Sequence, residues 1–349
     1  PTKVSTAFLA QKEPDIVLQN LHQSALEWNE DGIAIDVKQL AKDWGLYDTF
    51  RPEAIAEWTD KNGVLRAFPL EGYTWPVWYN KAIFDKAGAK IPKTIDELID
   101  AAQKIRKIGY KPFVTGGSDW TGQFVYFITM ATMLTDNEVR DLYSSGGFSN
   151  NPNALKGAEV FVKLRDSGVF ADDVQGMTMA AMNEDFFAEK AAMMMAGSWS
   201  FAECPNEIKD HIVLGGFPLP SESPHKRPII YASYEGKGLW ITRNGAKKLD
   251  TVEKFVKFFY SQKTMGRFVM DAAMTSPLID TPVDASKLDK LFVQSNEMLN
   301  RVDVTMIHKV YLPVAAGESV RRAANEAYIS NMSAQKIIEN FDKIYRDIR

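Results

Sequence analysis

The sequence predicts an α/β protein with more than one domain. Short apolar runs alternate with amphipathic stretches at a spacing of 3.6 residues, a pattern typical of strands that alternate with helices. The chain has 349 residues, more than one domain of ordinary size, so we expect two domains or lobes. Hydrophobic residues make up 45% and charged residues 25%, which is the balance of an ordinary globular protein.

The apolar runs and their flanking residues place the elements along the chain. The predicted strands cover residues 15–18, 64–70, 76–79, 192–196, 212–217 and 238–242. The predicted helices run from Thr94 to Gly109 and through residues 161–164, 252–260 and 337–348. The first of them begins with a capping box, in which Thr94 and Glu97 bind each other's backbone N–H groups.

Polar residues follow the first predicted strand. Gln19, Asn20 and His22 come where the carboxyl end of this strand is expected to open into a loop. Ligands of open α/β sheets bind at such strand ends. These three residues are therefore candidates for binding a ligand.

Composition excludes several classes of protein. Lys and Arg number 41 against 45 Asp and Glu, and no basic block occurs, so we expect no nucleic-acid partner. No apolar run is long enough for a transmembrane helix. The one cysteine, Cys204, excludes an intramolecular disulfide and a cysteine-type zinc site. Because the chain starts at Pro1 rather than at a methionine, no targeting segment can be identified from it.

Common catalytic motifs are absent. The chain has no His-Glu-x-x-His, no Gly-x-Ser-x-Gly and no Gly-x-Gly-x-x-Gly after a strand. Residues 117–122 have the glycine spacing of a phosphate loop, but Gln123 and Phe124 replace the required Lys and Ser/Thr. The histidines stand singly, so each is expected to be a surface residue or a hydrogen-bonded core residue. They are His22, His211, His225 and His308. Only His22, at the end of a predicted strand, is kept as a candidate for the site. We therefore expect no metal and no cofactor.

Carboxylates leave one catalytic alternative open. A glycoside-acting enzyme needs two acidic side chains on either side of the scissile bond. Glu71, Asp119 and Glu235 lie in glycine-flanked segments and are the candidates. Nothing in their spacing singles out an acid and a nucleophile, so binding without catalysis is the preferred interpretation.

Aromatic residues gather in turn-like or strand-end segments. They are Trp75, Trp78, Tyr79, Trp120, Trp199, Tyr231, Tyr234 and Trp240. The apolar C–H face of a pyranose ring packs on an indole or phenol, while its hydroxyls bind polar groups around the rim. The alternative is that these side chains are large core residues, which is the role we assign to the methionines of residues 177–195.

Several motifs resemble the solute-binding proteins of ABC sugar importers, the maltose-binding-protein-like cluster. The pattern is clearest in residues 78–88, WYNKAIFDKAG, and 92–98, PKTIDEL. Residues 14–17 (PDIV), 187–193 (FAEKAAM) and 197–199 (GSW) resemble further family segments in the same order. Glu189 stands where the family usually has glycine. The family also has a strand, a helix and a second strand before its Pro-Asp-Ile segment, and we expect these elements to be missing here.

This resemblance implies a type II periplasmic-binding-protein fold. Two α/β lobes would be joined by hinge strands, with the ligand cleft between them. Lobe 1 would take residues 1–73 plus 239–294, and lobe 2 residues 76–234 plus 295–349. The hinges would fall near residues 72–75 and 235–238, where glycines permit a change of backbone angles.

The resemblance also implies the residues that bind the ligand. Trp199 matches the stacking tryptophan of the family, and Trp120, after Asp119, lies in a loop that presents an aromatic ring to the sugar. Gln19, Asn20 and His22 would enter the cleft from the first strand. The residues that flank the crossings complete the set: Glu71, Trp75, Tyr234, Glu235 and Lys237.

The function that follows is capture of a mono- or oligosaccharide outside the cytoplasmic membrane and its delivery to the permease subunits of an ABC transporter. The protein would be a monomer, either free in the periplasm or anchored by a lipid, and would catalyse no reaction. Two alternatives remain open: a glycoside-acting enzyme, and the same fold with a polyamine, metal or phosphate as ligand.

Overall fold

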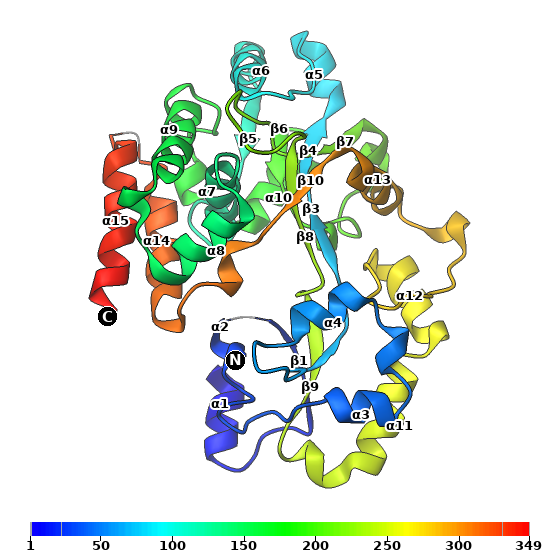
Figure 1. The fold of residues 1–349 in the computed structure, drawn as a ribbon. Coiled ribbons are helices and arrows are strands. Elements are labelled where there is room, and N and C mark those ends of the chain that lie inside the picture. Colours follow the sequence, from blue (N-terminus) through cyan, green and yellow to red (C-terminus); the bar gives the residue numbers. More distant parts are fainter. Residues whose placement is uncertain (1, 22, 330, 349) are drawn as a thin grey trace. The chain divides into compact units, whose positions relative to one another are not determined.

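The computed structural model describes residues 2–21, 23–329 and 331–348, which form two compact units (Figure 1). Unit 1 comprises Pro1–Thr74 and Ala232–Phe292, and unit 2 comprises Trp75–Tyr231 and Val293–Arg349. The chain passes between them within β3 (Tyr73–Trp75), within β8 (Ile229–Ser233) and within α13 (Lys290–Met298). The first of these divisions lies inside the predicted hinge at residues 72–75, and the second lies a few residues before the predicted hinge at residues 235–238. Bending at these places stays a prediction.

Unit 1 is built on a sheet with the strand order β1–β9–β2, in which β9 is antiparallel to both neighbours. These strands are β1 (Ile16–Asn20), β2 (Phe68–Pro69) and β9 (Lys237–Ile241). The helices, blue and yellow in Figure 1, are α1 (Thr2–Leu9), α2 (Gln23–Leu26), α3 (Lys38–Asp43), α4 (Pro52–Trp58), α11 (Leu249–Phe259) and α12 (Gln262–Ala272).

Three buried tryptophans form the centre of unit 1. The indole of Trp240, on β9, lies edge-to-face with Trp28 and Trp58, with ring centroids 5.1 and 5.7 Å away. Such aromatic pairs contribute about 0.5–1.5 kcal/mol beyond the area they bury. Trp240 is therefore a core residue, although its strand-end position in the sequence also suited a sugar contact.

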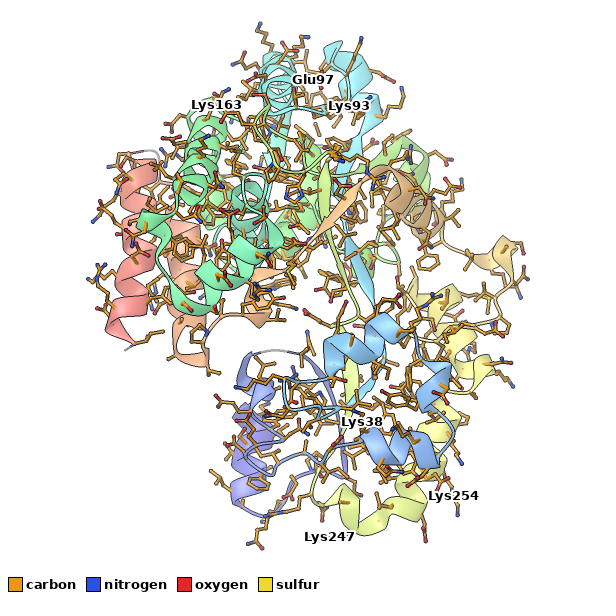
Figure 2. All side chains as sticks on the ribbon, in the orientation of Figure 1. Lys38, Lys93, Glu97, Lys163, Lys247 and Lys254 are labelled. Atoms are coloured by element: carbon orange, nitrogen blue, oxygen red, sulfur yellow. The ribbon has the colours of Figure 1, made fainter. Side chains whose placement is uncertain are left out.

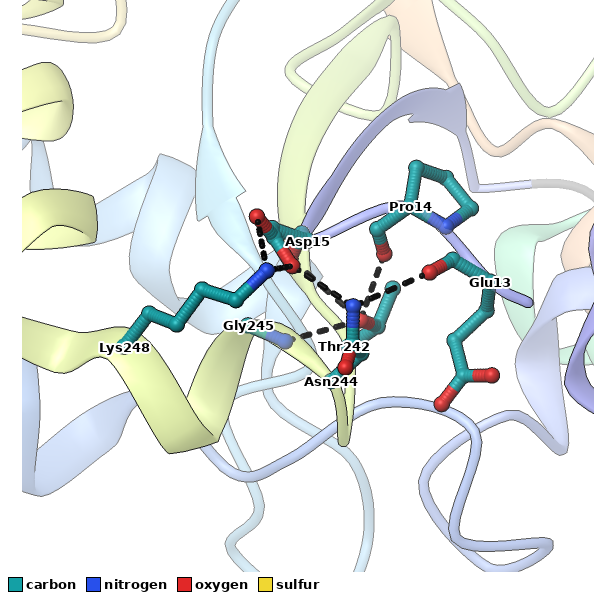
Figure 3. Close-up of polar contacts among 7 residues, drawn as sticks. All are labelled: Glu13, Pro14, Asp15, Thr242, Asn244, Gly245 and Lys248. Carbon is teal, nitrogen blue, oxygen red and sulfur yellow. Dashed lines mark hydrogen bonds and ion pairs between the residues drawn. The ribbon is translucent and has the colours of Figure 1, made fainter. Parts of the chain in front are cut away.

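Polar contacts fix the start of β1 against the end of β9 (Figure 3). Asp15 accepts hydrogen bonds from Asn244 Nδ2 (2.7 Å) and Lys248 Nζ (2.9 Å). The hydroxyl of Thr242 donates to the carbonyl oxygen of Pro14 (2.6 Å). The Pro-Asp pair thus anchors the start of β1 to the segment that follows β9.

Two expectations about the strands of unit 1 were wrong. Gln19 and Asn20 are the last residues of β1, paired with β9, rather than part of a loop. Residues 64–70 do not form one strand, because only Phe68–Pro69 pairs with β9. The carbonyl of Leu65 accepts from Val37 N and the N–H of Arg66 donates to Trp58 O, so the backbone before β2 is bonded to other segments.

Unit 2 contains a sheet with the order β5–β6–β4–β7, in which β5 runs parallel to β6 and β4 antiparallel to β6 and β7. The strands are β4 (Val77–Asn80), β5 (Lys111–Val114), β6 (Ala191–Met195) and β7 (Ile212–Gly215). Strands β3 and β8, within which the unit boundaries fall, form a separate sheet with β10 (Asp303–Thr305) in the order β10–β8–β3, with β10 parallel to β8. The helices are α5 (Lys81–Ala87), α6 (Ile95–Lys107), α7 (Gly122–Ala131), α8 (Asp136–Ser145), α9 (Pro152–Asp166), α10 (Met179–Phe187), α14 (Gly317–Glu326) and α15 (Ala334–Asp347).

The start of α6 confirms the predicted capping box. Thr94 Oγ1 accepts from Glu97 N (3.2 Å), and the Glu97 carboxylate accepts from the backbone N–H groups of Thr94 and Lys93. Lys93 and Glu97 are labelled at this helix end in Figure 2, together with Lys163, which reaches from α9 to Asp96 at 2.6 Å. Local sequence alone therefore placed this helix correctly.

The methionines of residues 177–195 are core residues, as expected, except Met179, which is half-buried. Every residue of β6, from Ala191 to Met195, is buried between β4 and β5. Trp78 on β4 is also fully buried, and its Nε1 donates to Ala196 O at 2.9 Å. Both units mix helices and strands, which confirms the α/β class. Within the described residues, no helix is long and apolar enough to cross a membrane.

Candidate functional site

Three tryptophans that are distant in sequence come together in unit 2. The ring centroid of Trp75, at the end of β3, lies 5.0 Å from that of Trp199 and 5.8 Å from that of Trp120. Trp120 and Trp199 are 6.1 Å apart, with their ring planes at 40°. Trp120 is 40% exposed and Trp199 37%, whereas Trp75 is only 3% exposed. We call these three residues the tryptophan tray, in which two exposed indoles pack against a buried third.

The Gly-Ser-Trp segment positions Trp199. It follows β6 and forms the short helix Ser198–Ser200. The indole of Trp199 folds back over Gly197, so a Cβ at that position would lie 2.2 Å from the ring. Only glycine fits there without displacing the ring, because no Cβ makes so close a contact. The motif is thus a steric requirement of the tray.

The loop after β5 positions Trp120. Asp119 Oδ1 accepts from the backbone N–H (2.8 Å) and the hydroxyl (2.6 Å) of Thr121, and Oδ2 accepts from Met179 N (2.6 Å). A Cβ on Gly116 would lie 2.1 Å from Thr121 Oγ1, so the loop is closely packed. Both carboxylate oxygens of Asp119 therefore bind the protein itself. Its contact with a ligand stays a prediction, whereas its support of the Trp120 loop is a direct observation.

A second aromatic layer lies behind the tray. The ring of Phe124, on α7, is 4.1 Å from Trp75 and 6.0 Å from Trp120, and Tyr231 lies 6.2 Å from Phe124. By sequence, Phe124 stood out only because it departs from the pattern of a phosphate loop. Phe124 is the third residue of α7, and the continuous apolar run that starts there could have indicated a buried position for it.

Helix α14 adds polar groups that the sequence analysis missed. Asn325 Nδ2 donates to the carbonyl oxygen of Asp119 (2.9 Å), next to Trp120. One turn earlier, Arg321 Nε binds Glu318 Oε2 (3.1 Å). This hydrogen bond raises the pKa of Arg321 and lowers that of Glu318, so the two side chains form a charged pair near Asp119.

Unit 1 brings together another set of predicted site residues. At the end of β1, Gln19 pairs with Gly238 and Asn20 with Lys237 on β9. Gln19 Nε2 donates to Asn20 Oδ1 (3.2 Å), and Lys237 Nζ lies 3.1 Å from Glu71 Oε1. The amide, ammonium and carboxylate groups at this sheet end can both donate and accept hydrogen bonds. Their role toward a ligand stays a prediction.

Tyr234 and Glu235 form the turn before β9. Glu57 Oε2 accepts from Ser233 Oγ (2.7 Å) and from the backbone N–H of Tyr234 (2.6 Å). Burial raises the pKa of the Tyr234 phenol, an effect that Arg51 opposes. The side chain of Glu235 is buried, and its backbone N–H donates to Ser233 Oγ (2.9 Å). These contacts hold the backbone of the turn in place.

The histidines differ in their surroundings. His22 lies outside the described residues. His211 Nδ1 lies 2.9 Å from Glu189 Oε2, and His225 Nε2 lies near two backbone carbonyl oxygens at 3.0 and 3.1 Å, as expected for hydrogen-bonded residues. For His308 the expectation was wrong: it is 1% exposed, and neither ring nitrogen has a hydrogen-bond partner among the described residues.

Acidic side chains and partly exposed indoles give the candidate site its chemical character. Among residues 2–21, 23–329 and 331–348, no group of three or more His, Cys, Asp or Glu side chains could hold a metal ion. Of the three candidate acids, Asp119 binds its own loop and Glu71 pairs with Lys237. Unit 2 offers a pair of partly exposed indoles, which are suited to binding a flat, partly apolar surface.

The two-unit α/β fold agrees with the family to which comparison with known proteins assigns the chain. Residues 1–266 match the family of bacterial extracellular solute-binding proteins. The chain belongs to this family. A solved structure of a probable secreted solute-binding lipoprotein from Streptomyces coelicolor is 36% identical with a TM-score of 0.86, covering 99% of this chain and 87% of that one. This likeness confirms the predicted type II fold of two α/β lobes.

Curated relatives match over shorter stretches. A probable sugar-binding periplasmic protein of Rhizobium meliloti is 27% identical over 192 residues, covering 53% of this chain and 45% of the relative. The sn-glycerol-3-phosphate-binding periplasmic protein UgpB of Salmonella typhimurium is 28% identical over 238 residues, covering 64% of this chain and 52% of the relative. The matches thus span about half the length of these relatives.

Proposed function

We propose that this chain is an extracytoplasmic binding protein that captures a mono- or oligosaccharide and delivers it to the permease subunits of an ABC transporter. The tryptophan tray carries this proposal. Membership of an extracellular family supports the location, in the periplasm or anchored by lipid at the membrane. The Rhizobium relative, which is named a sugar-binding protein, supports the class of ligand.

The tray suits pyranose rings for a physical reason. Each ring has a face of C–H groups that loses contact with water when it packs on an indole, while the hydroxyls at its edge keep hydrogen-bond partners. Trp120 and Trp199 are both exposed but tilted by 40°, so they can contact two faces of a ligand or two successive rings. Two polar side chains of α14 lie beside the Trp120 loop, since Asn325 binds the carbonyl oxygen of Asp119 and Arg321 interacts with the charge of Asp119, and we expect them to contribute to binding hydroxyls.

Binding would act by shifting the protein between conformations, and the liganded form would be recognised by the permease. No covalent step is needed, and the protein would work as a monomer. A glycoside-acting enzyme is the alternative, and it predicts products from a glycoside. The resemblance to UgpB keeps a phosphorylated polyol as a second ligand class to test.

A thermal-shift screen tests the proposal directly. The panel contains mono- and oligosaccharides, polyamines, inorganic phosphate and sn-glycerol 3-phosphate, because a ligand that binds only the native state raises the melting temperature by mass action. We expect a sugar to give the largest rise, with no product detected by chromatography. A rise with phosphate or glycerol phosphate alone, or turnover of the sugar, would contradict the proposal.

The tray itself is tested by Trp199→Ala. We expect calorimetry to show sugar affinity at least about tenfold weaker, or ~1.4 kcal/mol. The matched control is Phe258→Ala, which removes an aromatic ring that is 67% exposed on α11 of unit 1. Unchanged affinity in a folded Trp199→Ala protein would exclude this residue from the site.

A further inference from the structure

His308 is a buried titratable residue that sugar binding does not explain. It begins the short helix His308–Val310, after β10. Its ring centroid lies 3.6 Å from that of Phe127, and 5.3 Å from those of Phe124 and Tyr143. The imidazole is therefore enclosed by aromatic rings from α7 and α8.

This position is costly for a histidine. Neither of its ring nitrogens has a hydrogen-bond partner among the described residues, and the same holds for the Tyr143 hydroxyl beside it. A buried polar group without a partner costs about 1–3 kcal/mol. Phenylalanine or leucine would fill the space without that cost, so packing alone does not account for a histidine here.

One side chain connects His308 to the tryptophan tray. Phe124 contacts His308 at 5.3 Å, Trp75 at 4.1 Å and Trp120 at 6.0 Å between ring centroids. Phe124 and Trp75 are both buried, and buried side chains in close packing cannot shift alone. A displacement of the imidazole therefore moves Phe124 and, through it, the surface on which a ligand packs.

We propose that His308 is a proton-sensitive positioning residue for the tryptophan tray, through which acid weakens ligand binding. The inference rests on the proposed function. The neutral imidazole packs as a flat ring behind Phe124. The protonated ring has to reach water or a hydrogen-bond acceptor, and in doing so it leaves that position.

The direction of the pH effect follows from linkage. Burial lowers the pKa of His308 well below its ordinary value, and the nearby charge of Lys309 lowers it further. A bound ligand holds the tray in place and makes protonation harder still, so the complex carries fewer protons than the free protein. Affinity then falls as pH falls, by at most about tenfold per pH unit for a single group.

The other titratable groups around His308 define the control that is needed. From α8, Tyr143 contacts the ring, and burial raises its pKa, so it stays neutral in acid. Asp136, the first residue of α8, accepts from the backbone N–H of Met306 (3.2 Å). Helix α7 carries no charged residue, and Lys309 follows in the same short helix. Because Asp136 also faces this segment, wild type has to be compared with variants changed only at residue 308.

The test compares wild type, His308→Phe and His308→Gln by calorimetry from about pH 7.5 down to about pH 4, because burial holds the pKa of His308 well below the range in which histidine ordinarily titrates. Maltose, cellobiose, xylobiose and raffinose are the probes, and the one with the largest thermal shift is used. We expect the wild-type Kd to stay level near neutral pH and to rise toward the acid end of this range by a larger factor than the Kd of either variant, since neither substituted side chain takes up a proton. Gln keeps the test valid if the Phe variant does not fold.

Two results would overturn the inference. One is a wild-type Kd that does not change with pH, and the other is a rise in both variants parallel to that of wild type. Absence of binding by wild type at neutral pH contradicts the proposed function instead. The two failures are therefore distinguishable.

Discussion

Asp119 provides the sharpest test of the site, because two interpretations of it predict different outcomes. In a glycoside-acting enzyme it would be an acid or nucleophile, so its replacement would abolish turnover with little effect on the fold. In the structure its carboxylate holds the Trp120 loop through Thr121 and Met179. Asp119→Ala should therefore lower both stability and sugar affinity.

The contacts set the magnitude. Asp119→Ala removes three hydrogen bonds to a charged acceptor, at 2.8, 2.6 and 2.6 Å. Each such bond contributes about 1.5–3 kcal/mol when buried, and since Asp119 is half-buried we expect a total of about 3 kcal/mol. In Asp119→Asn, only one of the two side-chain atoms that bind Thr121 and Met179 remains a hydrogen-bond acceptor. The variant therefore either loses the bond from Met179 N or places its NH₂ group, a donor, against the donors of Thr121. We expect it to cost about 1–2 kcal/mol.

Denaturant unfolding measures the change in stability, and calorimetry at a temperature where the variants remain folded measures the change in affinity. The control is Asp96→Ala, which removes an exposed ion pair with Lys163 and should change stability by no more than about 0.5 kcal/mol. If Asp119→Ala unfolds within about 0.5 kcal/mol of wild type, the carboxylate does not support the loop and this reasoning fails.

Further predictions concern other parts of unit 2. Asp342 accepts three backbone N–H bonds from residues 147–149 (2.9, 2.7 and 2.8 Å). Burial raises the pKa of Asp342, but the three hydrogen bonds outweigh burial and leave the pKa below its ordinary value. The carboxylate therefore stabilises the folded protein at neutral pH, and this stabilisation is lost as pH falls through the lowered pKa. Asp342→Ala should cost about 2–3 kcal/mol in denaturant unfolding at neutral pH, and an equal cost in strong acid would contradict this. Glu189 has a left-handed backbone conformation, with φ at 53°. Both Glu189→Ala and Glu189→Gly lose the contact with His211, but only glycine adopts this conformation without strain, so the Ala variant should be about 1 kcal/mol less stable than the Gly variant. Equal melting temperatures of the two variants would refute the strain argument. Trp78→Ala should lower the free energy of unfolding by about 3–5 kcal/mol, because this side chain is fully buried. Trp120→Ala should change sugar affinity more than stability, because its indole is partly exposed. Thermal melts measure the effect on stability, and calorimetry measures the effect on affinity.

Features that depend on near neighbours in the chain could be predicted from the sequence. The capping box of α6 joins Thr94 to Glu97, three residues on, and the segment after β6 needs glycine because Trp199 folds back two residues. The buried run of β6 needed only its continuous apolar character. In each case the physical cause lies within one turn or one strand, where sequence spacing fixes which side chains meet.

The residues of the site depend on partners far away in the chain. By sequence, Trp78, Trp199 and Trp240 are alike, yet the packing of other segments leaves only Trp199 exposed. The role of Asp119 as a support of its loop depends on Met179, which is 60 residues further along the chain. The absence of hydrogen-bond partners for the ring of His308 among the described residues likewise depends on the side chains that the fold packs around it. The class of fold, the family and the presence of aromatic candidates all follow from the order of residues along the chain. Tertiary structure decided which of these candidates contact water, because exposure depends on what packs over a side chain rather than on the side chain itself.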